Sequence, residues 1–179
     1  LTGLFRDGTL PTPSNQWLPV TNALILGMSA AIFEEFARYV VLRWWVKKDR
    51  GWKNGLIFGM GHAGMEAMLV GGLIFYGFLA MISLQGRDLS LTIPEEQLNL
   101  IRSQVQAYWT ATWYDSLLGF VERALTIPIQ LALAVLVMHS VDLMQSRWLL
   151  MALIWHTLVD ATVVYAFGVW GAYLAEGIL

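Results

Sequence analysis

The stretch of sequence that decides the fold is GLIFGMGHAGMEAMLVGGLIFYGFLAMISL, which runs from Gly55 to Leu84. It is almost entirely apolar, and it exceeds the about 20 residues that a helix needs to cross the hydrocarbon core of a bilayer. Its two strongly polar side chains are His62 and Glu66. A run of this kind predicts a membrane-spanning helix, in which two such residues need an explanation.

The whole chain shares this apolar character. Hydrophobic residues make up 57% of its 179 residues and charged residues 13%, about half of the roughly 25% that a typical soluble domain carries. Four stretches are apolar and long enough to cross a bilayer. We therefore predict an all-α fold, a polytopic transmembrane helix bundle with four membrane-spanning helices at about residues 21-46, 55-84, 113-141 and 147-174.

We expect residues 1-179 to form a single integral membrane domain. Because the chain begins with Leu1 rather than Met, we also expect it to be a fragment of a longer protein. The polar segment from Gln85 to Thr112 contains a helix start at Pro94, followed by acidic residues. Leu98 and Ile101 then recur at helical spacing, which predicts an amphipathic helix along the membrane surface.

The basic residues predict the orientation of the spans. Lys47, Lys48, Arg50 and Lys53 crowd the short loop between the first two spans. By the positive-inside rule this loop is cytoplasmic, and the turn that joins the last two spans lies on the same side.

Composition also excludes several classes of function. The net charge of −2 argues against a polyanionic partner, so no nucleic-acid binding is expected. Cysteine is absent, which excludes disulfides and a thiol nucleophile. A zinc site in this chain would have to use histidine, aspartate and glutamate.

Ionisable side chains inside the predicted spans are the main functional signal. Each costs several kcal/mol in lipid, and such residues usually mark a site or a pathway. All three histidines of the chain are among them. The residues are Glu34, Glu35 and Arg38 in the first span, His62 and Glu66 in the second, Glu122, Arg123 and His139 in the third, and His156 and Asp160 in the fourth.

Their spacing predicts one buried site. Three pairs are four residues apart and therefore share a helix face: Glu34 with Arg38, His62 with Glu66, and His156 with Asp160. At a rise of about 1.5 Å per residue, the acids of these pairs lie roughly 17 Å from the cytoplasmic ends of their spans and the histidines roughly 12 Å. Three helices thus present acids and histidines at one depth.

Glu122 and His139 fit this level less well. Glu122 lies about 30 Å from the cytoplasmic end of a straight third span, and His139 lies near the boundary. Glu122 with Arg123 could equally be a structural pair between helices. Gly59, Gly61 and Gly64 follow no predicted strand, so they indicate close helix packing rather than a dinucleotide site.

Such a cluster suits peptide hydrolysis. A carboxylate in a pocket of low dielectric is a stronger base than one in bulk water, and a base with donors for an oxyanion hydrolyses peptide bonds. His62 would orient the water, and His156 would donate to the oxyanion. Alternatively His62, Glu66 and His156 with a water would form a zinc site. A proton- or cation-coupled carrier is a further alternative, since intramembrane acids and histidines also build proton relays. So is an immunity or scaffold protein without activity.

Four motifs in order resemble a known family. EEFAR (Glu34 to Arg38), GMGHAGMEA (Gly59 to Ala67), ER (Glu122-Arg123) with a later His139, and HTLVD (His156 to Asp160) are similar to the YhfC family of bacterial membrane proteins. That family is regarded as glutamic-type intramembrane endopeptidases, and it is similar to the CAAX prenyl endopeptidases and the bacteriocin-immunity (Abi) proteins. Its earlier label as a metalloprotease family keeps the zinc alternative open.

The resemblance implies the roles of the site residues. Glu34 would be the catalytic base, with His62 as its partner on the water. His156 and Asp160 match the pair proposed for the oxyanion hole, where the CAAX pattern has Asn in place of Asp160. The candidate catalytic residues are Glu34, Glu35, His62, His156 and Asp160, and the supporting ones are Arg38, Glu66, Glu122, Arg123 and His139.

The resemblance also implies a setting. We expect an integral protein of the bacterial cytoplasmic membrane, in contact with membrane lipid, that hydrolyses a peptide or membrane-protein substrate. No cofactor is firmly predicted, and a zinc ion would be held by His62, Glu66 and His156.

Overall fold

The computed structural model describes residues 16–48, 50–87 and 94–171, and most of these residues are helical with no strand among them. The predicted all-α helix bundle is confirmed. The elements are α2 (Leu18–Val40), the π-helical turn η1 (Val41–Trp45), α3 (Trp52–Leu84), α4 (Glu95–Thr110), α5 (Trp113–Leu143) and α6 (Ser146–Trp170).

Among the described residues, three helices are long and apolar enough to cross a membrane: α3, α5 and α6. The prediction of four spans is therefore too high by one on this measure. The first predicted span corresponds to α2 and η1, where Asn22, Glu34, Glu35 and Arg38 lower the hydropathy. The fourth prediction ran to residue 174, and its last three residues lie outside the described part of the chain.

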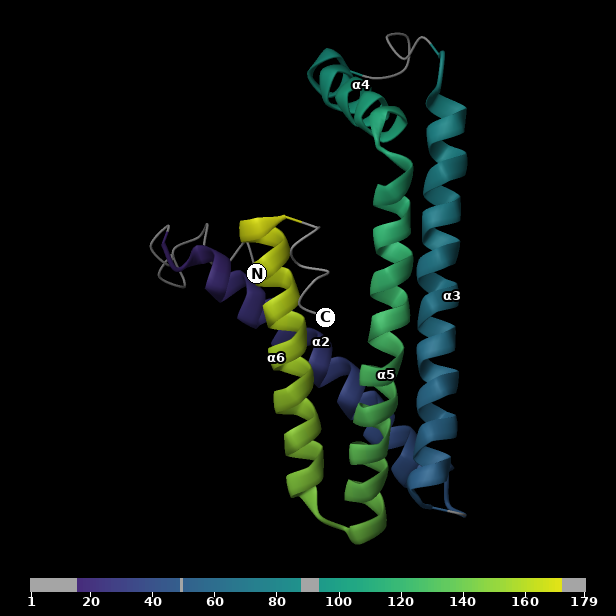
Figure 1. Cartoon of the computed structure of the whole chain (residues 1–179), viewed down its shortest axis with the longest axis vertical. Helices are drawn as coiled ribbons and strands as arrows, with labels where there is room; N and C mark the ends of the chain where they lie inside the picture. The colour runs from purple at the N-terminus through teal and green to yellow at the C-terminus, as the bar shows by residue number, and fades with distance from the viewer. Residues whose placement is uncertain (1–15, 49, 88–93, 172–179) are drawn as a thin grey trace.

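The helices form two closely packed pairs. α2 packs mainly on α6 and α3 mainly on α5, while contacts of α5 with α6 and with α2 join the pairs. Figure 1 shows α3, α5 and α6 running lengthwise through the bundle, with α2 crossing them obliquely. The loop before α3 and the turn between α5 and α6 lie at the same end, as the predicted topology requires. Which side of a membrane this end faces stays a prediction.

The connecting regions contain the local signals that end and start these helices. α4 begins directly after Pro94, as predicted, and it lies across the far end of α5 (Figure 1). Thr112 and Asp115 form a capping box that starts α5. Met144, in the left-handed conformation with φ 56°, ends α5 and allows the tight turn into α6. The position of α4 on a membrane surface stays a prediction.

Glycines set the close approach of α3 to α5. A Cβ at Gly59 would lie 2.9 Å from the Ala134 Cβ and 3.0 Å from the Leu131 Cα, so no side chain fits there without movement. A Cβ at Gly55 would likewise lie 3.1 Å from the Val135 Cα. These contacts fix the register of the two helices.

The packing role predicted for three glycines of α3 holds at one of them. Gly61 and Gly64 have open space around the position of a Cβ, so the prediction was wrong for these two. Helix periodicity explains the difference, since residues two and five positions from Gly59 point away from the face that meets α5.

Replacing Gly59 by valine should separate α3 from α5 and destabilise the fold. Overpacking of this kind costs about 1–3 kcal/mol. Gly61→Val, two residues away on the same helix, is the matched control and should change stability far less. Thermal unfolding of the detergent-purified protein measures both, and an equal loss in the two variants would contradict the glycine-set register.

Candidate active site

Predicted polar residues from each of the four spans line a cavity of about 400 Å³ between α2, α3, α5 and α6. One wall is aliphatic and includes Leu26, Ala30, Val159 and Val163. The polar lining residues are Glu34, Glu66, Glu122, Arg123, Thr126, Gln130, His156 and Asp160. The structure thus brings acids and histidines of three helices together, with α5 as a fourth contributor, and their common depth in a membrane stays a prediction.

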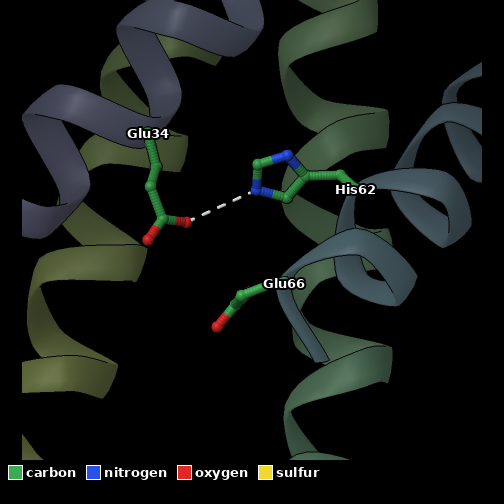
Figure 2. Close-up of side chains that lie close together, drawn as sticks. All are labelled: Glu34, His62 and Glu66. Carbon is green, nitrogen blue, oxygen red and sulfur yellow. Dashed lines mark ion pairs between the residues drawn. The ribbon is translucent and has the colours of Figure 1, made fainter. Parts of the chain in front are cut away.

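Glu34, His62 and Glu66 form a partly exposed group at the cavity, of which Glu34 and Glu66 line it. The Glu34 Oε2 lies 3.6 Å from the His62 Nε2, and each side chain is about one third exposed. One ligand atom of each residue lies within 4.8 Å of those of the other two. Figure 2 shows Glu34 on α2 facing His62 and Glu66 on α3 across this space.

A second group is fully buried. The Arg38 Nη1 donates to both oxygens of Glu35 at 2.8 Å, and neither side chain is exposed. The other partner of Glu35 is the His156 Nδ1, at 2.7 Å on α6. Arg38 therefore pairs with Glu35 and not with Glu34, although Glu34 shares its predicted helix face. Glu35 is absent from the cavity lining, so it stands behind the wall that Glu34 and His156 form.

The other nitrogen of His156 faces the cavity. Its Nε2 lies 3.4 Å from the Asp160 Oδ2 and 3.9 Å from the Glu34 Oε2. The predicted i,i+4 pair of His156 and Asp160 is a direct contact. Because Glu35 holds Nδ1, the ring can turn little, and Nε2 stays directed at the space beside Glu34.

Arg123 brings Glu122 to the site, which the depth estimate did not foresee. The Arg123 Nη1 donates to the Glu66 Oε1 at 2.8 Å, and its Nη2 donates to the Glu122 Oε1 at 2.5 Å. The depth estimate for Glu122 assumed that the cytoplasmic ends of all spans lie at one level. Gly55, near the start of α3, lies opposite Val135, so α5 continues for about two turns beyond that level.

Sequence analysis missed two polar residues of the cavity lining, Thr126 and Gln130, and Gln130 makes the more extensive contacts. It is buried, accepts from the Arg38 Nη2, and donates to the carboxylates of Glu34 and Glu66. The search for charged and histidine side chains passed over a neutral amide. The signal was its spacing, because Gln130 follows Arg123 by seven residues and therefore lies on the same face of α5.

His139 does not join the cluster. Its ring packs edge-on against Trp148 at 4.7 Å, near the turn between α5 and α6, and it is not part of the cavity lining. This position agrees with the depth expected for His139 near the membrane boundary, and its supporting role stays a prediction.

The donors at the cavity fit a divalent metal ion. Zinc binds nitrogen and oxygen ligands at about 2.0–2.2 Å in tetrahedral geometry, which places ligand atoms roughly 3.3–3.6 Å apart. The 3.6 Å between His62 and Glu34 matches this spacing. Arg123 and Gln130 donate to the carboxylates of Glu66 and Glu34, as outer partners of metal ligands do. The structure gathers Glu34 with His62 and Glu66, whereas the predicted set had His156 in that place.

The fold and the site define an integral membrane protein with an ionisable cluster buried among its helices. Residues 9–179 match the YhfC intramembrane metalloprotease family, and the chain belongs to this family. The predicted family is confirmed. Membrane protein YhfC of Bacillus subtilis (strain 168) is 33% identical over 142 residues, which cover 76% of this chain and 54% of the relative. The chain thus spans about half the length of that relative. No solved structure matches this chain.

Neutralising Glu35 should destabilise the protein much more than neutralising its neighbour Glu34. Glu35→Gln leaves Arg38 buried without a counter-charge, and breaking a buried ion pair costs about 3–5 kcal/mol. Glu34→Gln alters a partly exposed carboxylate and should cost under about 1 kcal/mol. Chemical unfolding in detergent, followed by circular dichroism, compares the two. Equal losses would argue against a structural role specific to Glu35.

Proposed function

We propose that the cavity is the active site of an intramembrane endopeptidase, which hydrolyses peptide bonds with a water activated at Glu34. The observation that carries the proposal is the position of the Glu34 carboxylate. It lies on the cavity wall between two imidazole rings, with Oε2 at 3.6 Å from the His62 Nε2 and 3.9 Å from the His156 Nε2. The family to which the chain belongs is described as intramembrane proteases, which supports the same activity.

Glu34 suits the role of general base. Such a base must reach the proton it removes at about 2.6–3.2 Å, and the open side of the carboxylate faces the cavity. A water beside Glu34 is also within reach of His62, which would orient it. Gln130 donates to the Glu34 Oε2 at 3.1 Å and holds the carboxylate in place while it receives the proton.

His156 suits the oxyanion. Its ring is fixed through Nδ1 by Glu35, so Nε2 is already aimed when negative charge develops on the carbonyl oxygen. Donors fixed in advance in a water-poor site are worth about 2.7–4 kcal/mol each in comparable hydrolases. Asp160, 3.4 Å from Nε2, holds that nitrogen in place until the oxyanion forms.

The aliphatic wall indicates the kind of peptide that would enter. Leu26, Ala30, Val159 and Val163 lie on the side of α2 and α6. Apolar residues beside the scissile bond would pack against this wall and exclude water from the charged side of the cavity. An apolar segment of a membrane protein or peptide is therefore the proposed substrate.

A metal-dependent version of the same reaction is favoured by the charge of the site. Five carboxylates and two guanidinium groups meet in and behind the cavity: Glu34, Glu35, Glu66, Glu122 and Asp160 against Arg38 and Arg123. Excess negative charge in a low dielectric needs compensation by protons or by a cation. Glu34, His62 and Glu66 would hold a divalent ion, and a zinc ion bound there supplies a Lewis acid. The family description as metalloproteases agrees.

Glu34→Gln should abolish peptide hydrolysis in both versions. A carboxamide cannot take the proton from water, and loss of a general base lowers the rate by about 10²–10⁴-fold. Cleavage of a membrane-peptide library by the full-length protein in detergent measures this. Asp142→Asn, at the exposed end of α5, is the control. Normal turnover by the Glu34 variant would rule out this residue as base or ligand.

Metal content and Glu66→Gln together separate the two versions. If a metal takes part, the purified protein carries about one zinc per chain, chelator stops cleavage, and Glu66→Gln lowers both metal content and activity. If Glu34 acts alone, chelator has no effect and Glu66→Gln remains active. Elemental analysis beside the cleavage assay decides between them. Absence of cleavage in every condition would favour the carrier alternative.

A further inference from the structure

Gln130 occupies the centre of the polar network, although it carries no charge. Its side chain comes from α5, is 6% exposed, and bonds to groups on both α2 and α3. A buried polar group left unpaired costs about 1–3 kcal/mol, so an amide in this position has to have its donors and acceptor matched.

The partners fix the orientation of the amide. The carbonyl Oε1 accepts from the Arg38 Nη2 at 2.5 Å. The Nε2 donates to the Glu34 Oε2 at 3.1 Å and to the Glu66 Oε2 at 3.3 Å. Guanidinium groups only donate and ionised carboxylates only accept, so a flipped amide would face like groups on both sides. Each of its two N–H groups therefore has one carboxylate.

We infer that Gln130 is a positioning residue that holds the carboxylates of Glu34 and Glu66 side by side on the cavity wall. The inference rests on the proposed function and deepens it. Oxygens of the two carboxylates lie within 4.8 Å of each other, so the ionised groups repel. A donor shared by both offsets this repulsion and fixes the two side chains. Arg38, which is held by its ion pair with Glu35, in turn fixes the orientation of the Gln130 amide.

The roles of donor and acceptor can be separated by one substitution. Gln130→Glu has the same shape and keeps an oxygen for Arg38, which becomes an ion pair. It removes both N–H donors and places a third carboxylate against Glu34 and Glu66. A residue needed only to bury Arg38 would tolerate this change, whereas a residue that positions the two acids would not.

Gln130→Glu should lower kcat of the full-length protein by about 10–100-fold, as loss of an outer partner of a catalytic group does. KM should change little, because Gln130 acts on the acids and not on the aliphatic wall. Ser140→Ala, another buried polar residue of α5 outside the cavity lining, is the control and should keep both constants. Unchanged kcat in Gln130→Glu, or a loss confined to KM, would overturn the inference.

A second measurement does not depend on activity. Gln130→Glu should lower the unfolding midpoint in the wild-type background. In Glu34→Gln/Glu66→Gln it should lower the midpoint much less, since the two new amides can donate to the new carboxylate. An equal shift in the two backgrounds would contradict the positioning role. If the wild-type protein cleaves no peptide, the proposed function fails, and this comparison alone decides the role of Gln130.

Discussion

The rest of the structure depends on the contacts of one buried carboxylate, that of Glu35. It neutralises Arg38 on its own helix and holds His156 on α6, with no exposure of Glu35 or Arg38. Charges buried in this way are tolerated only when their partners stay in contact. Close packing of α2 on α6 keeps these partners in contact. Gly27 permits the close packing, since a Cβ at this position would lie 2.7 Å from the Ala161 nitrogen. The contact of Glu35 with His156 therefore holds α2 against α6, and the close packing at Gly27 keeps that contact in place.

A second constraint places the catalytic candidates of α3 against α5. Glu66 follows Gly59 by seven residues, and Gln130 follows Arg123 by seven, so each pair lies on one face of its helix. Gly59 packs directly on α5 next to Leu131. Two turns further along, the same faces bring Glu66 between Arg123 and Gln130. The packing of small residues thus determines the geometry of charged ones.

Sequence analysis predicted the helical class, the positions of the main helices and most of the polar residues at the cavity. These follow from the length of apolar runs and from the cost of charge in lipid, both of which are local properties. The partners of each charge did not follow. Arg38 bonds to Glu35 rather than Glu34, and Arg123 reaches Glu66, because helix crossing angles and relative heights decide such contacts. Gln130 was missed for a related reason, since its importance lies entirely in its neighbours.

The two adjacent glutamates illustrate why a site of this kind needs both. Successive residues on a helix point about 100° apart at 3.6 residues per turn, so Glu34 and Glu35 face different surroundings. Both oxygens of Glu35 accept from Arg38, one also faces His156, and the carboxylate is buried and absent from the cavity lining. Glu34 is one third exposed at the cavity and keeps an open side. A single acid could not balance the buried guanidinium and also take part in chemistry, because the first task places the carboxylate behind the cavity wall and the second requires it on that wall.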